Sequence, residues 1–278
     1  MTEVGERPAD DEGEEREHEQ QHHRIGNRHH FGRRYVSTLV ISESAVGDAI
    51  NAFTMFDVWG TVAGTLGATL SGNLKLAYEA WLRGAMQKPS ELAELIGLLQ
   101  ERPPMTAVEI GTARGGTVYV WCEVADPRAT IVSIDLPGGS FGSGYSEAEI
   151  PAPDAYGKPQ QELRFLLADS HDPATRAELQ QILRGSSIDF LMIDGDHSYD
   201  GVKRDFELYS PLVAEDGLIA FHDIAPHSTA AGCEVQRFWT ELRQSHSHLE
   251  FVDPVSESDL AAGWGGIGVI RWHQPELS

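Results

Sequence analysis

The sequence predicts an α/β fold built on a mostly parallel sheet of seven strands, with helices on both faces and an antiparallel last strand. Two observations carry this prediction. After residue 104, short apolar runs alternate with segments of helical periodicity, which is typical of a parallel sheet covered on both faces. The last two apolar runs have no helix between them, which indicates an antiparallel strand at the end of the fold.

The predicted strands are short apolar runs bounded by turn residues. They lie at residues 106–110, 130–134, 163–168, 188–193, 217–221, 249–253 and 266–272. The predicted helices between them lie at 117–124, 173–184, 201–209 and 235–242. Asp172 followed by Pro173 marks one helix start, because aspartate is a favoured N-cap and proline suits the first helical position.

Three parts are expected along the chain. Residues 1–34 are acidic and rich in histidine, with too few apolar side chains to fold, so we expect a disordered tail. Its histidines could bind a metal, although a solvated tail is the simpler interpretation. Residues 35–104 are expected to form a mostly helical extension, in which Ser90 caps a helix. Residues 105–278 are expected to form the ligand-binding domain.

The composition argues against several classes of protein. With 43 acidic and 21 basic residues, the net charge is −22, which disfavours binding to nucleic acid phosphates. The two cysteines, Cys122 and Cys233, are far apart, so we expect no disulfide framework and a reducing, cytoplasmic setting. We expect neither a secretory signal nor a membrane span, because the longest uncharged run, residues 58–74, is shorter than the about 20 residues that cross a bilayer.

A glycine turn follows the first predicted strand. Gly111, Gly115 and Gly116 lack a Cβ atom, so the backbone there can approach a ligand closely. This is where α/β folds bind nucleotide-like cofactors, although an ordinary strand-to-helix turn also favours glycine. The spacing is GxxxGG rather than the phosphate-binding GxGxxG, and no GxxxxGK[ST] occurs. A nucleoside without phosphates therefore fits better than a dinucleotide.

Acidic side chains stand at or just after the ends of the first five predicted strands. They are Glu109, Asp135, Asp169, Asp194 and, after His222, Asp223. The carboxyl ends of the strands line the ligand crevice of an open α/β sheet, so these side chains are expected to gather there. Asp135 stands where a carboxylate would meet ribose hydroxyls.

The densest polar cluster follows the fourth predicted strand. Asp194, Asp196, His197 and Asp200, together with the pair His222-Asp223, could hold a divalent cation. Carboxylates suit magnesium or manganese, and an imidazole also admits zinc or iron. A hydrogen-bonded turn with helix caps is the alternative.

One predicted connection, residues 137–160, is unusually long and rich in glycine. It leaves the carboxyl end of the second strand, where ligands lie, so we interpret it as a mobile wall or lid over the site. Simple disorder is the open alternative.

Two stretches resemble a known family. Val108 to Thr117 resembles the first motif of class I S-adenosylmethionine-dependent methyltransferases. Ile193 to Val202, followed by Gly217 to Ile224, resembles a narrower branch that includes cephalosporin-hydroxylase-like and macrolide-sugar O-methyltransferases. The resemblance covers residues 105–272 and implies a Rossmann-like, seven-stranded sheet with an antiparallel last strand.

The resemblance also implies roles for individual residues. The residues that would bind S-adenosyl-L-methionine are Glu109, Gly111, Gly115 and Gly116 at the methionine part, Asp135 at the ribose, and Asp169 and Ser170 at the adenine. The residues that would bind a divalent cation, with magnesium favoured, are Asp194, His222 and Asp223. His197 would be the catalytic base beside Asp194. His222 departs from the family, because metal-dependent members have an acid at that position, and this leaves the identity of the metal open.

We therefore expect an enzyme, an S-adenosylmethionine-dependent O-methyltransferase that acts on a hydroxyl of a small molecule such as a natural product or a sugar, with a metal ion assisting. An NAD-dependent oxidoreductase is the first alternative, but it requires the missing GxGxxG. A non-catalytic cofactor-binding protein is the second, and acids at every strand end argue against it. The expected partners are a hydroxylated small molecule and further copies of the chain, with no nucleic acid and no membrane.

Overall fold

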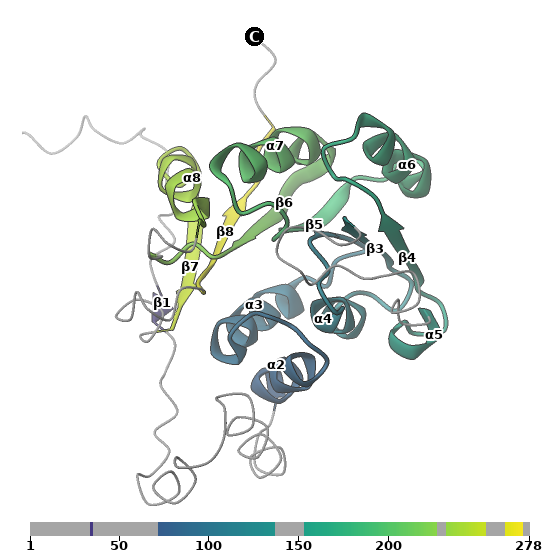
Figure 1. Ribbon diagram of the computed structural model, residues 1–278. Helices are drawn as coiled ribbons and strands as arrows, with labels where there is room; N and C mark the ends of the chain where they lie inside the picture. The colour runs from purple at the N-terminus through teal and green to yellow at the C-terminus, as the bar shows by residue number, and fades with distance from the viewer. Residues whose placement is uncertain (1–33, 36–71, 137–152, 227–231, 254–264, 275–278) are drawn as a thin grey trace, which may run out of the picture.

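The computed structural model describes residues 34–35, 72–136, 153–226, 232–253 and 265–274. Its strands form one sheet in the order β1-β7-β8-β6-β5-β2-β3-β4 (Figure 1). The strands are β1 (Arg34–Tyr35), β2 (Thr106–Ile110), β3 (Thr130–Asp135), β4 (Glu162–Leu167), β5 (Ile188–Ile193), β6 (Val213–His222), β7 (His248–Val252) and β8 (Ile267–Arg271). The helices are α2 (Gly72–Leu82), α3 (Pro89–Glu101), α4 (Gly116–Val124), α5 (Pro153–Tyr156), α6 (Pro173–Leu183), α7 (Tyr199–Tyr209), the 3-10 helix η2 (Ser210–Leu212) and α8 (Val235–Leu242).

The predicted fold class is confirmed. Strands β4, β3, β2, β5 and β6 pair in parallel, and β8 pairs antiparallel with both β6 and β7. All seven predicted strands occur, although β6 begins at Val213, earlier than the predicted 217. The short strand β1, parallel to β7, was not predicted, because two residues carry no readable periodicity.

Two hydrophobic layers cover the sheet. One contains buried side chains of α2, α3 and α4, and the other contains those of α7 and α8 with apolar residues of α6, on the opposite face (Figure 1). Leu92, Leu95 and Ile96 of α3 are fully buried in the first layer, and α3 packs against β7 and β8. Residues 72–104 therefore share the core of the sheet.

The start of helix α3 differs from the expectation. Lys88 is the N-cap, Pro89 occupies the first helical position, and the hydroxyl of Ser90 donates to Asp253 Oδ2 at 2.8 Å. Glu91 is fully buried and accepts backbone N–H bonds from Asp253 and Gly266, each at 2.8 Å. Ser90 is thus not the cap, because tertiary contacts engage its hydroxyl. By contrast, the predicted cap Asp172 is confirmed, since it accepts from the N–H of Ala174 at 2.8 Å.

Several predictions fall on residues outside those that the structure describes. They concern the tail up to residue 33, most of the extension before residue 72, and residues 137–152 of the predicted lid. In the part of the chain that is described, no helix combines the length and the apolarity needed to cross a bilayer.

Candidate active site

The register of the sheet places the predicted site residues at one edge. Ile110 of β2 pairs with Ile134 of β3 and with Ile193 of β5, and Ile193 pairs with Phe221 of β6. The residues that follow these positions are Gly111, Asp135, Asp194 and His222, so all four lie at the carboxyl edge. Strands β2 and β5 are neighbours in the sheet but not in the sequence, and α/β folds bind ligands outside such a switch in strand order.

Gly111 lies where the backbones of β2 and β5 come together. Its φ is +89°, and a Cβ atom there would lie 1.9 Å from the carbonyl oxygen of Asp194. Its N–H donates to Ile134 O, and the N–H of Asp194 donates to Ile110 O, each at 2.8 Å. Only glycine therefore allows the chain after β2 to pass this close to Asp194.

The glycine turn is held in place by Asp135. Its Oδ2 accepts the N–H groups of Thr112 at 3.2 Å and Ala113 at 3.0 Å. Gly115 is the N-cap of α4 with a φ of +80°, and Gly116 packs so tightly that a Cβ would lie 2.2 Å from the backbone nitrogen of Ala85. Glycine is therefore needed at position 116 so that the start of α4 can pack against the end of α2.

The structure places Glu109 in the interior. Its side chain is 1% exposed, Oε1 accepts from the indole of Trp121 at 2.8 Å, and Oε2 accepts from the hydroxyl of Ser133 at 3.0 Å. Burial raises the pKa of this carboxyl to about 7, against the lowering effect of hydrogen bonds from Thr117, Trp121 and Ser133. Both oxygens are engaged by neighbouring side chains, so contact with a cofactor remains a prediction for this residue.

The raised pKa of Glu109 predicts a pH-dependent stability. A carboxyl whose folded pKa lies above its unfolded value stabilises the fold below the unfolded pKa of 4.5, and this contribution is lost as pH rises through about 7. Glu109→Gln mimics the protonated acid at every pH. We expect the melting temperature of the wild type to fall relative to that of Glu109→Gln between about pH 5 and about pH 8, measured by calorimetry. Parallel melting curves would contradict a raised pKa.

The predicted adenine side is formed after β4. Asp169 Oδ1 accepts the N–H of His171 at 2.8 Å, and the backbone oxygen of Ser170 accepts from the hydroxyl of Tyr209 at 2.7 Å. His171 Nε2 lies 3.3 Å from the fully buried carboxylate of Asp205, which raises the pKa of His171. Contacts from α7 therefore hold the loop that carries Asp169 and Ser170.

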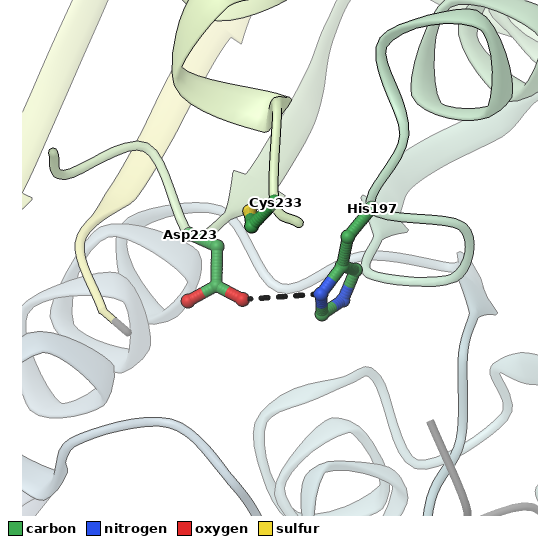
Figure 2. A group of neighbouring side chains, drawn as sticks. All are labelled: His197, Asp223 and Cys233. Carbon is green, nitrogen blue, oxygen red and sulfur yellow. Dashed lines mark ion pairs between the residues drawn. The ribbon is translucent and has the colours of Figure 1, made fainter. Parts of the chain in front are cut away.

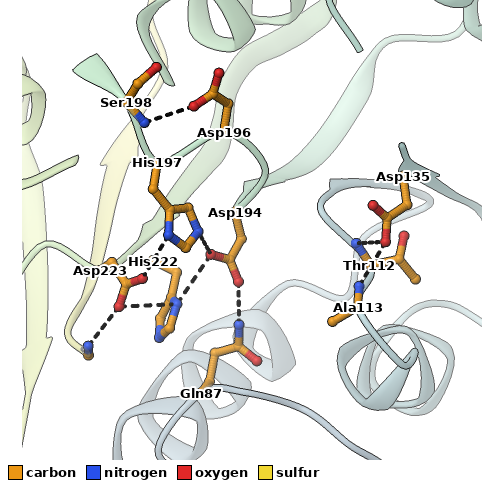
Figure 3. A network of polar contacts seen from close by, with 11 residues as sticks. Gln87, Thr112, Ala113, Asp135, Asp194, Asp196, His197, Ser198, His222 and Asp223 are labelled. Atoms are coloured by element: carbon orange, nitrogen blue, oxygen red, sulfur yellow. Dashed lines mark hydrogen bonds and ion pairs between the residues drawn. The ribbon is translucent and has the colours of Figure 1, made fainter. Parts of the chain in front are cut away.

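Asp194 is the centre of a buried polar group (Figure 3). Its Oδ1 lies 3.2 Å from His222 Nδ1 and 3.3 Å from His197 Nε2, while Oδ2 accepts from Gln87 Nε2 at 2.6 Å. Asp223 completes the group, with Oδ1 at 3.5 Å from His222 Nδ1 and Oδ2 at 3.5 Å from His197 Nδ1 (Figures 2 and 3). The structure thus brings together the turn after β5 and the end of β6, as the strand ends predicted.

The charges in this group support one another. Burial alone would lower the pKa of His222, but the carboxylates of Asp223 and Asp194 raise it to about 10. His222 and His197 in turn lower the pKa of Asp194, against the effect of its burial. His197 also has a raised pKa, because the effect of Asp194 and Asp223 exceeds that of burial. Near neutral pH, Asp194 is therefore ionised and His222 carries a proton.

Asp223 adopts an unusual backbone conformation. Its φ is +61°, in the left-handed region that a side chain other than glycine rarely adopts, and its Oδ1 accepts the N–H of Gly265 at 2.7 Å. Strained conformations of this kind are retained where the surroundings enforce them, and they cluster at functional sites. Here the strain turns the carboxylate toward His197 and His222.

Two acids of the predicted cluster, Asp196 and Asp200, stabilise the start of α7. Asp196 Oδ1 accepts the N–H of Ser198 at 2.8 Å, and Ser198 caps α7 by accepting the N–H of Gly201. Asp200 lies in the first turn of α7, where a negative charge favours the helix. The capping interpretation therefore applies to these two residues, and neither belongs to the groups of side chains within cation-binding distance that occur among the described residues.

Gln87 was missed in the sequence. It is 3% exposed and belongs to the connection between α2 and α3, where no motif or periodicity marks it. Among the described residues, neither its Oε1 nor His222 Nε2 has a hydrogen-bond partner, although both atoms are buried. Buried polar groups normally have partners, so these two atoms indicate that the site is built to receive another group.

The arrangement fits a divalent cation in its choice of ligand atoms. Asp194, His222 and Asp223 each offer one ligand atom, and these atoms lie within 4.8 Å of one another. Two carboxylates and one imidazole are ligands for magnesium, manganese, iron or zinc. Because a ligand imidazole must be neutral, His222 would have to lose its extra proton to hold a cation here.

Part of the chain matches known proteins. Residues 108–224 match a family model described as a methyltransferase domain. An uncharacterized protein of Sinorhizobium fredii, y4gI, is 29% identical over 174 residues. That match spans 61% of this chain but only 17% of the relative, so this chain corresponds to a small part of the longer protein.

Two solved structures are similar to this chain. The O-methyltransferase TomG from Streptomyces achromogenes, in complex with SAM, is 15% identical with a TM-score of 0.50, covering 80% of this chain and 100% of that one. An O-methyltransferase from Bacillus cereus, in complex with SAH, is 19% identical with a TM-score of 0.47, covering 78% and 100%. Residues 108–224 of this chain thus match a methyltransferase domain model, and the likeness to TomG shows that the two chains share a fold.

Proposed function

We propose that the protein is an O-methyltransferase that transfers the methyl group of S-adenosylmethionine to a hydroxyl of a small molecule, with assistance from a divalent cation. The observation that carries this proposal is the group around Asp194, where two carboxylates and two imidazoles converge beside the glycine turn. The resemblance to the macrolide-sugar branch favours a sugar or another natural product as acceptor. The O-methyltransferase titles of both solved structures agree with the choice of oxygen.

The cofactor residues divide the proposed site into three regions. Gly111 and the turn up to Gly116 would lie at the methionine part, Asp135 at the ribose, and the loop of Asp169 and Ser170 at the adenine. S-adenosylmethionine supplies a methyl group that is already activated by the sulfonium charge, so the protein must align the acceptor oxygen with that carbon. The orphaned Oε1 of Gln87, beside Asp194, is available to orient a bound group.

The proposed proton acceptor is His197 in its neutral form; because Asp194 and Asp223 raise its pKa, the fraction able to accept a proton grows as the pH rises. A neutral hydroxyl is a poor nucleophile, so methyl transfer requires a base within hydrogen-bond reach. The ring of His197 lies between Asp194 and Asp223, which fix its orientation at 3.3 and 3.5 Å and stabilise the imidazolium that forms. A cation held by Asp194, His222 and Asp223 would lower the pKa of a coordinated hydroxyl, with magnesium favoured by the resemblance. His222 replaces an acid, so manganese, iron and zinc are also compatible.

An NAD-dependent oxidoreductase is not favoured, because the turn from Gly111 to Gly116 lacks the GxGxxG spacing that binds a pyrophosphate. A non-catalytic binding protein would not need a base between two carboxylates. We further propose a cytoplasmic setting, no nucleic acid or membrane partner, and self-association of the chain.

An acceptor screen tests the proposed function. The protein, isotope-labelled S-adenosylmethionine and magnesium are incubated with a panel of glycosides, phenols and polyketide alcohols, and the products are analysed by mass spectrometry. We expect the wild type to form a methyl ether. His197→Ala should form it at least about 100-fold more slowly, since general bases contribute 10²–10⁴-fold to the rate. Label on nitrogen or carbon, or an undiminished rate in His197→Ala, would contradict the proposal.

A further inference from the structure

Cys233 brings a thiol to the edge of the Asp194 group. It forms a second cluster with His197 and Asp223 in which one imidazole nitrogen, one carboxylate oxygen and the sulfur lie within 4.8 Å of one another (Figure 2). Zinc binds such ligands at about 2.0–2.3 Å, so a contraction on the order of 1 Å would bring the three atoms to coordination distance.

The three side chains are held by a fixed backbone framework. The N–H of Glu234, the residue after Cys233, donates to the backbone oxygen of His197 at 2.8 Å. This bond ties the segment before α8 to the turn after β5. The carboxylate of Asp223 is oriented by Gly265 and by its own constrained backbone. Backbone hydrogen bonds therefore help to position the segments that carry these three side chains.

The chemistry of this cluster differs from that of the Asp194 group. The two share Asp223, but Oδ1 of that carboxylate lies near His222 and Oδ2 lies near His197, each at 3.5 Å. A thiolate together with an imidazole favours zinc, cobalt or other borderline metals, whereas magnesium prefers oxygen ligands. The two clusters thus offer neighbouring positions with different metal preferences.

We propose that His197, Asp223 and Cys233 form a second cation position that selects a transition metal of the zinc class. The thiol proton of Cys233 passes to the buffer when the metal binds, because the thiolate is the ligand form. A consequence rests on the proposed function: a nitrogen of His197 that is bound to metal is unavailable to accept the acceptor's proton. Zinc at this position is therefore an inhibitor of methyl transfer.

Cobalt(II) is the probe for this position, because a cobalt–thiolate bond has a charge-transfer absorption in the near ultraviolet. We expect titration of the full chain with Co²⁺ under reducing conditions to produce this band, and excess Zn²⁺ to remove it. Cys233→Ser should abolish the band, because it removes the thiolate that gives rise to it.

Two further variants separate this position from its surroundings. Cys122 is the other cysteine of the chain and is fully buried in the core, so Cys122→Ala should retain the band. Asp194→Asn removes a ligand of the neighbouring group; asparagine keeps an oxygen that can contact His197 Nε2, and Asp194 is not a ligand of the second position, so the band should also be retained. The proposal would be overturned if the wild type gave no band, or if the band survived in Cys233→Ser. Loss of the band in Asp194→Asn would also overturn it, because that result would indicate one joint metal centre instead of two positions.

The test does not depend on methyl transfer. The absorption band reports the metal position even if no acceptor is methylated, and titration of S-adenosylhomocysteine into the same samples reports the cofactor separately. If the absorption band is absent but the cofactor still binds, the second metal position is ruled out and the proposed function is unaffected. A band without cofactor binding would leave the second metal position standing and remove the proposed function.

Discussion

Asp194→Asn is expected to abolish divalent cation binding at the Asp194 group and to reduce methyl transfer by at least about 100-fold, since the loss of an outer-shell partner alone costs 10–100-fold in metal affinity or activity. The substitution keeps the shape of the side chain but removes the charge that faces His222, His197 and Gln87. Cofactor binding should largely survive, because Asp194 is not among the proposed cofactor-binding residues. Manganese binding measured by electron paramagnetic resonance, and S-adenosylhomocysteine binding measured by calorimetry, check the two parts.

Asp196→Asn is the matched control for this substitution. Asp196 lies two residues further along and caps the turn before α7 through Ser198, and asparagine retains that capping ability. It should leave both manganese and cofactor binding near wild-type values. Equal loss in the two variants would indicate a general electrostatic effect of the acidic turn, and normal turnover in Asp194→Asn would rule out the proposed mechanism.

Gly111→Ala is expected to cause the largest loss of stability and of cofactor affinity. A Cβ there would lie 1.9 Å from Asp194 O and 2.4 Å from Asp194 C, both backbone atoms that no side-chain rotation can move. The ends of β2 and β5 would have to separate at the point where the cofactor is expected. We expect a cost above about 4 kcal/mol, in the range reserved for severe clashes, measured by denaturant unfolding.

Gly185→Ala separates the clash from the strain of a positive φ. Gly185 has a φ of +88°, close to the +89° of Gly111, but no atom lies within 4 Å of an added Cβ. This variant should lose only the about 1–2 kcal/mol that an L-residue loses in the left-handed region, with unchanged binding of S-adenosylhomocysteine. Similar losses in the two variants would show that the crossing of β2 and β5 is not what requires glycine at position 111.

Much of the fold could be predicted because the relevant signals are local. The alternation of apolar runs and helical periods located all seven main strands, and β2 and β5 occur at the predicted residues 106–110 and 188–193. The gathering of Asp194, His222 and Asp223 followed from the same pattern, since parallel strands end at one edge of the sheet.

The remaining features depend on contacts between distant segments. Gln87 reaches Asp194 across 107 positions of the sequence, and nothing in its own neighbourhood marks it. Glu91 has the pattern of an exposed acid in a first helical turn, yet it is fully buried against Asp253 and Gly266. Cys233 lies within residues 232–234, which are described and form no strand or helix, so its position beside His197 could not be read from periodicity.

Calorimetric titration of S-adenosylhomocysteine into the purified protein, first with magnesium and then with EDTA, tests the central claim most directly. We predict saturable binding at one site per chain in both conditions, because the proposed cofactor region consists of the turn at Gly111, Asp135 and the loop of Asp169 and includes none of the proposed metal ligands. Retention of that binding in EDTA, together with loss of methyl transfer, would assign the cation to the acceptor side. Absence of binding in both conditions would contradict the account.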